Sequence, residues 1–269
     1  MPWLRFRYAR RAGIGGQLQQ TDGLSIRQRA QYDDVGFVVL PGFADLATCD
    51  AMLDRVVALA RAKAAGGQRT PGFALPEANL AGRGGNPEEL VSKIFKLHRD
   101  DVFADFAASA AVTDRVAELA GPRLDCFLSQ FIFTNPGAWG QPWHQDSYYF
   151  HFDPPRPITA VWLAVTAATL ENGCLHVLPG SHREPIHEHI PDRRPNANYG
   201  YVEIVDHDMR DAVPVLLDPG DLLLFDSHLM HRSTDNVSNG LRAAMVYHYC
   251  TTGTVDTAQH PINDFVSVR

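Results

Sequence analysis

The sequence contains few of the features that mark several large protein classes. Its four cysteines, Cys49, Cys126, Cys174 and Cys250, lie far apart and form no CxxC pair. This spacing argues against a disulfide framework and predicts reduced thiols in a cytoplasmic protein. No apolar run approaches the roughly 20 residues that a membrane-spanning helix needs, so we expect no membrane partner.

An excess of basic residues is also lacking. The chain has 24 lysines and arginines against 31 aspartates and glutamates, which gives a net charge of −7. Because there is no basic stripe, zinc-finger pattern or P-loop, nucleic acid is not an expected partner. The first twenty residues contain Arg5, Arg7, Arg10 and Arg11 and no acid. We expect residues 1–24 to form a flexible leader, with an organellar presequence as the alternative.

The sequence has enough apolar residues for a sizeable core, since 45% of its 269 residues are hydrophobic. Its N-terminal part has mainly helical patterns. A capping box formed by Ser25 and Gln28 predicts a short helix over 26–34. Apolar spacing predicts further helices over 45–64, 88–97 and 101–120. A strand is expected at 36–43, and a loop at 66–87, where glycine, proline and small residues are frequent.

After Gly121 the pattern changes to short β-rich runs separated by turn signals such as NPG, ENG, DPGD and SNG. The expected strands are 125–134, 158–166, 174–178, 201–205, 213–217, 221–226 and 241–250. Many short strands with Gly and Pro turns are typical of a jelly roll. The sequence therefore predicts a mainly β protein in one domain over 25–269. Its double-stranded β-helix (cupin-like) core would span about 121–255, beneath an N-terminal helical layer at about 25–120.

The stretch GQPWHQDSYYFHFDPP, residues 140–155, contains a candidate metal site. His144 and Asp146 are two residues apart, a spacing that places both side chains on one face of a strand. Such a pair by itself is more often a surface hydrogen-bonding pair. His228 and His231, which follow the apolar run LLLFD, offer a third ligand. Two imidazoles and one carboxylate form a facial triad that leaves coordination positions open and suits iron(II) in oxygenases.

Arg242 lies eleven residues after His231, within the apolar run RAAMVYHY. An arginine in such a strand is seldom buried without an anionic partner. Its planar guanidinium matches a carboxylate through two parallel hydrogen bonds. A ligand that chelates iron and carries a distal carboxylate would supply that partner. His248 lies an even number of residues after Arg242, so on a regular strand its side chain would point to the same side, into the barrel.

These motifs occur in a wider pattern that covers roughly residues 28–250. The pattern includes GFVVLPGF, SKI, WHQD, AVWLAV, ENGCLHVLPGSH and HRSTDNVSNGLRA. Taken together they resemble the phytanoyl-CoA dioxygenase family of iron(II)- and 2-oxoglutarate-dependent oxygenases. The resemblance implies a double-stranded β-helix, iron(II) held by His-x-Asp and a distal His, and 2-oxoglutarate and O2 as cosubstrates.

The resemblance also implies roles for individual residues. It implies that His144, Asp146 and His231 ligate the iron and that Arg242 binds the far carboxylate of 2-oxoglutarate. Ser233, Lys93, Trp162 and Gln130 match further residues near the cosubstrate. His231 is preferred over His228 as the distal ligand because of its eleven-residue offset to Arg242 and the hydroxyl two residues later. In a regular strand, residues three apart would point to opposite faces.

Purely structural roles are the alternative for these further residues. Lys93 would then lie on the solvated face of the expected 88–97 helix, Trp162 would be core, and Ser233 and Gln130 would be ordinary strand residues. Most other histidines are expected in turns or at the surface, namely His176, His182, His187, His189, His207 and His260.

Candidate substrate contacts surround the His-x-Asp pair: Trp143, Tyr148, Tyr149, His151 and Phe152. They predict a small, partly apolar organic substrate. We expect an unactivated C–H of this substrate to be hydroxylated or otherwise oxidised, with release of succinate and CO2. A halogenase is disfavoured because Asp146 is present, whereas related halogenases lack the carboxylate ligand. A non-catalytic cupin-like binding protein is disfavoured by the triad together with Arg242. The expected assembly is a monomer or homodimer.

Overall fold

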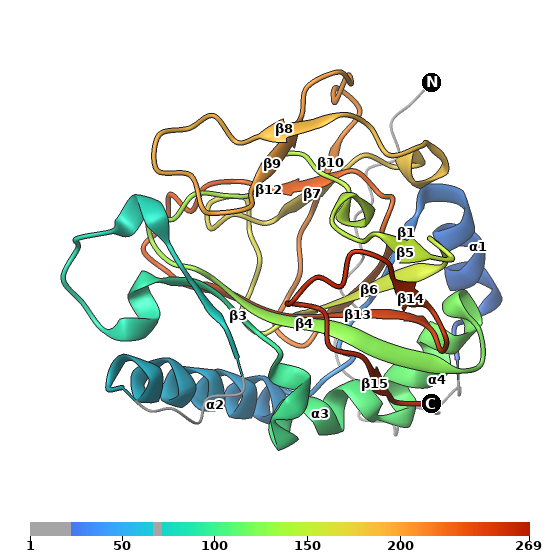
Figure 1. Ribbon diagram of the computed structural model, residues 1–269, viewed down its shortest axis with the longest axis horizontal. Helices are drawn as coiled ribbons and strands as arrows, with labels where there is room; N and C mark the ends of the chain where they lie inside the picture. Colours follow the sequence, from blue (N-terminus) through green and yellow to red (C-terminus); the bar gives the residue numbers. More distant parts are fainter. Residues whose placement is uncertain (1–22, 67–71) are drawn as a thin grey trace, which may run out of the picture.

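The protein is described here by a computed structural model that covers residues 23–66 and 72–269. Of the leader expected over 1–24, all but Gly23 and Leu24 lies outside the described residues. The largest sheet has the strand order β1-β11-β6-β13-β4-β3-β2, with β15 also paired to β4 (Figure 1). Its strands are β1 Phe37–Leu40, β2 Ala74–Pro76, β3 Val91–Phe95, β4 Leu124–Thr134, β6 Ile158–Ala164, β11 Leu222–Asp226, β13 Arg242–Thr251 and β15 Val266–Ser267.

A smaller sheet with the order β10-β7-β12 lies over one face of the large sheet (Figure 1). Two further strand pairs are β5 with β14 and β8 with β9. The bounds are β5 Phe152–Asp153, β7 Leu175–Val177, β8 His189–Pro191, β9 Val202–Ile204, β10 Val213–Val215, β12 His231–Ser233 and β14 Val255–Asp256. The two facing antiparallel sheets confirm the predicted mainly β, jelly-roll core.

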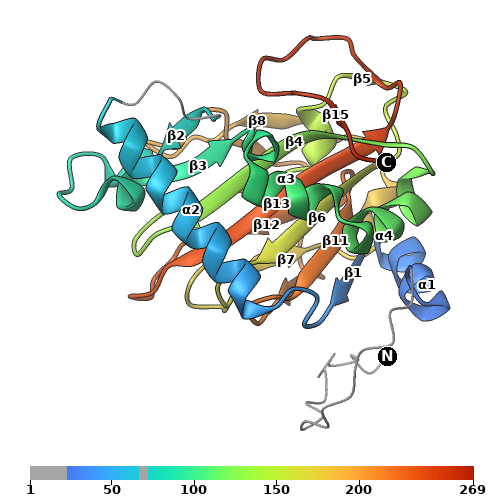
Figure 2. The same ribbon diagram turned by 90° about the horizontal axis from the view of Figure 1, so that it is seen from below.

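Helices cover the other face of the large sheet. They are α1 Ile26–Val35, α2 Leu46–Ala64, α3 Asp101–Ala108 and α4 Ala110–Ala120. Figure 2 shows α2, α3 and α4 lying across β13, β4 and β6. The predicted capping box is present, since Ser25 Oγ accepts from Gln28 N and Gln28 Oε1 accepts from Ser25 N. Short 3₁₀ helices occupy Ala78–Leu80, Pro87–Leu90, Leu97–Arg99, Asp146–Tyr148 and Ser181–Arg183.

Strand β13 connects the helical layer to the barrel interior through its alternating side chains. Tyr247 and Tyr249 point toward the helices, where their hydroxyls donate to the carbonyls of Phe103 and Ala107. Positions of the other parity, including Ala244 and Val246, pack in the core between the two sheets. Because side chains alternate along a strand, Arg242 and His248 belong to the interior set.

The N-terminal part departs from the predicted elements in three places. The stretch 88–97, predicted as a helix, is a 3₁₀ turn followed by β3, which pairs with β4. Long-range pairing with a buried strand outweighs the local helical pattern there. The helix predicted over 101–120 is interrupted at Ser109, whose ψ of 141° is extended. The loop predicted over 66–87 contains β2, which extends the sheet beside β3.

Among the described residues, the structure has no helix that is both long and apolar enough to cross a membrane.

Candidate metal centre and cosubstrate pocket

The two histidines of the candidate triad lie opposite each other on adjacent backbone segments. His144 and His231 form an isolated antiparallel bridge, in which each backbone N donates to the other residue's carbonyl at 2.9 and 3.0 Å. The two segments stay close beyond this bridge, since the backbone N of Ser233 donates to the carbonyl of Gln141. At Gly140 an added Cβ would lie 2.2 Å from the carbonyl oxygen of Ser233. A glycine is therefore needed for the segment before His144 to approach β12 closely enough.

Asp146 completes the cluster from the start of a 3₁₀ turn. Its Oδ1 lies 3.5 Å from Nε2 of His144 and 3.7 Å from Nε2 of His231. All three ligand atoms lie within 4.8 Å of one another, and all three side chains are buried. The predicted strand is corrected here, because Gln145 is still extended but the chain enters a 3₁₀ turn at Asp146. The turn still brings the carboxylate to the histidine pair.

Both imidazoles are oriented by their second nitrogen. Nδ1 of His144 lies 2.8 Å from the carbonyl oxygen of Pro142, and Nδ1 of His231 lies 2.9 Å from that of Leu229. A carbonyl only accepts hydrogen bonds, so the proton of each neutral ring belongs on Nδ1. Nε2 of each ring therefore presents its lone pair to the cluster, which is the arrangement of a metal-ligating histidine.

The charges of the cluster match those of a metal site. Burial and the nearby ring of His144 lower the pKa of His231 to about 4, so this imidazole is neutral at pH 7. Burial alone would raise the pKa of Asp146, but the imidazoles of His231, His248 and His144 outweigh burial and hold it well below its usual value. A neutral imidazole and an ionised carboxylate are the forms that bind a metal.

His248 contacts the oxygen of the Asp146 carboxylate that does not face the other two triad residues. Its Nε2 lies 2.8 Å from Oδ2 of Asp146, and its side chain is buried. The rings of Phe127 and Phe150 pack beside it. Oδ2 is thus engaged by His248, whereas Oδ1 faces the two histidines of the triad. The period-two argument from Arg242 correctly indicated that His248 points inward, but did not indicate its partner.

His228 lies outside the triad. It follows β11 in a turn, is half-buried, and its Nδ1 faces the carbonyl oxygen of Glu184 at 3.3 Å. His231 begins the separate strand β12. His228 therefore lies in a turn and His231 lies in a strand. The sequence analysis had assumed that both lie on one regular strand and point to its opposite faces.

A cavity of about 870 Å³ opens beside the triad. Such a volume is in the range of small-molecule sites. Arg242 lines it and is only 2% exposed, yet its Nε and Nη1 have no hydrogen-bond partner among the described residues. Burial lowers the pKa of this guanidinium to about 10. A buried cation with two free donors is the arrangement expected where an anionic ligand binds.

The other residues expected near the cosubstrate also line this cavity. Trp162 is buried, and its ring centroid lies 5.7 Å from Cζ of Arg242. Ser233 and Gln130 face the same space. Lys93 lies on β3, buried, so the alternative of a solvated helix face is wrong. Its Nζ donates to Oε1 of Gln141 at 2.8 Å, a partner that the sequence analysis missed because no local pattern marks it.

The candidate substrate contacts divide into two groups. Tyr148, Tyr149 and His151 line the cavity. Trp143 does not line it, because it packs with Leu178, Ile204 and Met230 in a separate cluster. Phe152 likewise lies in the cluster around Phe127 and is not part of the cavity wall. Neither placement fits the substrate contact expected for these two aromatic residues.

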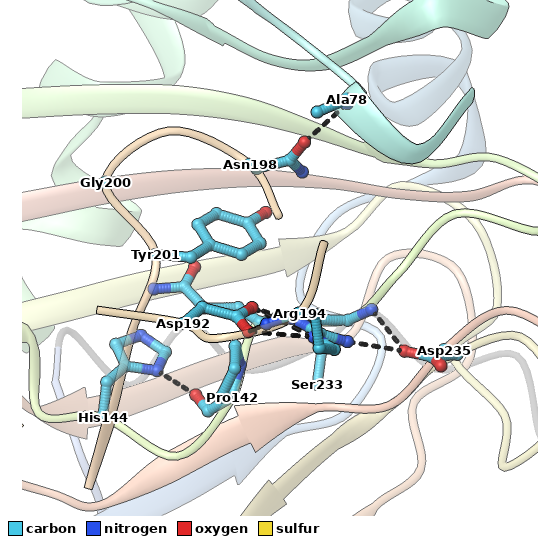
Figure 3. A network of polar contacts seen from close by, with 12 residues as sticks. Ala78, Pro142, His144, Asp192, Arg194, Asn198, Gly200, Tyr201, Ser233 and Asp235 are labelled. Carbon is cyan, nitrogen blue, oxygen red and sulfur yellow. Dashed lines mark hydrogen bonds and ion pairs between the residues drawn. The ribbon is translucent and has the colours of Figure 1, made fainter. Parts of the chain in front are cut away.

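The segment between β8 and β9 contributes Tyr199, Gly200 and Tyr201 to the cavity wall. Figure 3 shows how polar contacts hold this segment. Arg194 pairs with Asp192 at 2.6 Å and donates to the carbonyl oxygen of Gly140. Asn198 accepts from Ala78 N, and its Nδ2 donates to the buried Glu77.

Two histidines predicted for turns or the surface are buried. His189 is 8% exposed; its Nε2 accepts from the backbone N of Gln145 at 3.0 Å, and its ring stacks on Tyr148. His182 is also buried, at 7% exposed, in the turn after Gly180. The prediction was wrong for His189, which begins strand β8, and right for His182, which lies in a turn. The burial of both side chains was not foreseen, because turn signals in the sequence do not show what packs over a turn.

Comparison with known proteins agrees with this geometry. Residues 32–244 match the family model described as phytanoyl-CoA dioxygenase. The chain belongs to the phytanoyl-CoA dioxygenase family. It is 26% identical to the peroxisomal phytanoyl-CoA dioxygenase of Bos taurus over 239 residues, which cover 86% of this chain and 70% of the bovine protein. It is 32% identical to phytanoyl-CoA dioxygenase 1 of Oryza sativa subsp. japonica over 155 residues, or 57% of this chain and 54% of the rice protein.

Solved structures of similar fold include the apo form of ThoJ, described as a non-heme monooxygenase. That structure has a TM-score of 0.69 and 25% identity, covering 89% of this chain and 82% of the other. EctD from S. alaskensis, solved with 2-oxoglutarate and 5-hydroxyectoine, has a TM-score of 0.65 and 23% identity over 88% of this chain and 79% of the other. The family resemblance inferred from the sequence motifs is therefore confirmed, and the chain is a dioxygenase-family enzyme.

Proposed function

We propose that this protein is an iron(II)- and 2-oxoglutarate-dependent dioxygenase. It would use O2 to hydroxylate or otherwise oxidise an unactivated C–H of a small organic substrate and release succinate and CO2. The observation that carries this proposal is Arg242, a buried guanidinium with two unpartnered donors in the cavity beside the triad. A metal-binding scaffold without a cosubstrate would have no use for such a charge.

The donor set of the triad fits iron(II). Two neutral imidazoles and one carboxylate supply three ligands and leave other positions open, as in non-haem oxygenases. No cysteine takes part, since all four cysteines are buried elsewhere as free thiols. Asp146 Oδ1 lies between both histidines, which disfavours a halogenase that needs the carboxylate position free.

The cavity fits 2-oxoglutarate as the chelating ligand. The unpartnered Nε and Nη1 of Arg242 leave N–H donors free for an anionic group, and a guanidinium matches a carboxylate well. Trp162 covers the guanidinium, and Ser233 lies on the same wall. EctD, a structural neighbour, was solved with 2-oxoglutarate. The roles of Lys93 and Gln130 near the cosubstrate remain part of this proposal.

The bound metal and oxo acid supply the oxidising chemistry, and the chain's own residues supply geometry. His248 fixes Oδ2 of Asp146, so that Oδ1 stays directed at the metal position. The Nδ1 hydrogen bonds of His144 and His231 fix the ring planes. Arg242 holds the far end of the cosubstrate beneath the ring of Trp162, and the ring of Phe225 packs against His231, so that apolar surface excludes water from both parts of the cavity.

The substrate is proposed to enter on the side of Tyr148, Tyr149 and His151. These residues line the cavity, and Tyr148 and His151 are also exposed to solvent. These side chains suit a molecule with an apolar body and some polar groups. The molecules named for the curated relatives and for two structural neighbours are diverse, namely phytanoyl-CoA, 5-hydroxyectoine and nogalamycin, so the reaction class is better supported than any single substrate.

Anaerobic addition of iron(II) and 2-oxoglutarate tests this proposal. We expect a weak visible charge-transfer band only when both are present. Admission of O2 should then give slow succinate formation, and a substrate screen should detect a product heavier by one oxygen atom. A folded, iron-loaded protein that shows neither the band nor succinate would support the non-catalytic binding protein instead.

A further inference from the structure

A second cluster of ligand-type side chains lies at the base of the β8–β9 hairpin. Glu184 and His187 precede β8, and Asp206 and His207 follow β9. Nε2 of His187 and Nε2 of His207 lie 3.0 and 3.1 Å from the same atom, Oε2 of Glu184. The two rings are nearly perpendicular, with centroids 5.0 Å apart. None of these residues lines the cavity beside the triad.

The second nitrogen of each ring already faces an acceptor. Nδ1 of His187 lies 3.4 Å from Oδ1 of Asp206, and Nδ1 of His207 lies 3.0 Å from the carbonyl oxygen of Asp208. The proton of a neutral His207 therefore belongs on Nδ1, whereas His187, whose Nε2 is hydrogen-bonded to Glu184, would have to carry its proton on Nδ1, facing Asp206, in order to bind a metal. In that form two Nε2 lone pairs face one carboxylate oxygen, and these three atoms repel one another. A cation placed among them would attract all three.

The same electronic pattern occurs in the triad of this chain. There, too, each Nδ1 faces an oxygen acceptor, and the two Nε2 atoms face one carboxylate oxygen, Oδ1 of Asp146. Histidines that bind metals commonly donate their other N–H to a carboxylate or a backbone carbonyl. His207 has the second kind of support, and the carboxylate of Asp206 lies 3.4 Å from Nδ1 of His187, in position to give the first kind.

We propose that Glu184, His187 and His207 form a second metal site, which binds a zinc-type divalent cation with water as a fourth ligand. Ligands about 2.0–2.2 Å from a tetrahedral zinc ion are roughly 3.4 Å apart, slightly more than the separations in this cluster. Glu184 supplies the adjustment, because its side chain is 38% exposed whereas His187 and His207 are 16% and 22% exposed. Imidazole nitrogens favour zinc over calcium or magnesium.

The ion would join the two ends of the β8–β9 excursion. The tip of that hairpin supplies Tyr199 and Tyr201 to the cavity. The base is also joined to the iron centre, since the backbone N of His187 donates to Oε1 of Gln145 at 2.9 Å. Gln145 lies between the ligands His144 and Asp146 in the chain. The site is therefore structural, and its existence does not depend on the proposed dioxygenase function.

Zinc stoichiometry of the full-length protein tests the proposal, with zinc sulfate as the probe at concentrations close to that of the chain. We expect about two ions per chain in the wild type. Glu184→Gln and His207→Ala should each lose one ion, and His231→Ala should lose the other. The double variant Glu184→Gln/His231→Ala should bind none. Glu188→Gln is the matched control, because Glu188 is exposed and carries the same charge four residues further along the chain.

Melting curves supply the second measurement. Zinc should raise the melting temperature of the His231→Ala chain, and Glu184→Gln in that background should abolish the rise, whereas Glu188→Gln should not. A wild-type chain that binds one zinc ion, lost entirely in His231→Ala, would overturn the proposal. So would an unchanged stoichiometry in Glu184→Gln. Either result would reduce the cluster to an ion-pair network.

Discussion

Nε2 of His248 and Oδ2 of Asp146 are joined by a buried 2.8 Å hydrogen bond between β13 and the turn that follows His144. The bond leaves Oδ1 of the carboxylate directed at the two triad histidines. It also links the carboxylate to the strand that holds Arg242. The orientation of the proposed ligand is therefore set by a residue that does not itself touch the metal position.

We expect His248→Leu to weaken iron(II) binding by about 10–100-fold, the usual effect of losing a partner of a metal ligand. His248→Gln retains an N–H donor and should recover part of the affinity. Anaerobic titration of iron(II) measures both effects. An unchanged dissociation constant in a folded His248→Leu protein would show that Asp146 is held by other contacts.

His231→Ala should abolish stoichiometric iron binding at the cavity, whereas His228→Ala should preserve it. The reason is geometric, because His231 Nε2 faces Asp146 Oδ1 and His228 faces the carbonyl of Glu184. Iron content after anaerobic loading and desalting distinguishes the two variants. The reverse result would displace the triad and every cosubstrate role inferred from it.

Arg242→Leu should separate cosubstrate binding from stability. Breaking a buried charge pair costs roughly 3–5 kcal/mol, so the affinity for 2-oxoglutarate should fall by roughly a hundred- to several-thousand-fold. Without cosubstrate, however, the wild-type guanidinium is a buried cation with unpartnered donors. The variant should therefore melt at the same temperature as the wild type or higher.

Calorimetric titration of 2-oxoglutarate into the iron-loaded, oxygen-free variant measures the first effect, and a melting curve measures the second. Arg242→Lys should restore binding only in part, because an ammonium lacks the planar donor pair. A variant that unfolds, or loses iron as well, would identify Arg242 as a structural residue.

Glu77→Gln should stabilise the protein at neutral and alkaline pH. Glu77 is 2% exposed, and burial raises the pKa of its carboxyl despite hydrogen bonds from Asn198 and Ser92. A carboxyl with a raised folded-state pKa is favoured while protonated, and that stability is lost as pH rises through the folded pKa. The gain from glutamine should therefore be present at pH 8 and disappear in acid below the unfolded pKa. A melting-temperature difference that does not vary with pH would contradict this expectation.

The sequence predicted the jelly roll, and it predicted which side chains of β13 point into the barrel. Both predictions succeeded because alternation and turn signals are local properties of the sequence. It also brought together His144, Asp146, His231 and Arg242, mainly through the spacing of motifs. It placed Lys93 on a helix, because residues 88–97 have no strong alternation and β3 forms only by pairing with β4. Such pairing is a long-range effect that a local pattern does not contain.

Contacts between distant residues were the other part that the sequence could not supply. The partnership of His248 with Asp146 spans 102 positions, and that of Lys93 with Gln141 spans 48. The burial of His189 likewise depends on the ring of Tyr148, which lies on another segment. Trp143 was assigned to the substrate by proximity in the chain, but its side chain packs into a different cluster.

The two sides of the cavity have different tolerance for evolutionary change. Arg242, Trp162 and Gln130 lie on paired strands of the large sheet, where an insertion of one residue would turn the following side chains to the opposite face. Tyr148, His151 and Tyr199 lie outside strands, where length and sequence vary freely. A change of substrate can therefore arise by remodelling these loops while the strand residues that line the other side of the cavity keep their positions.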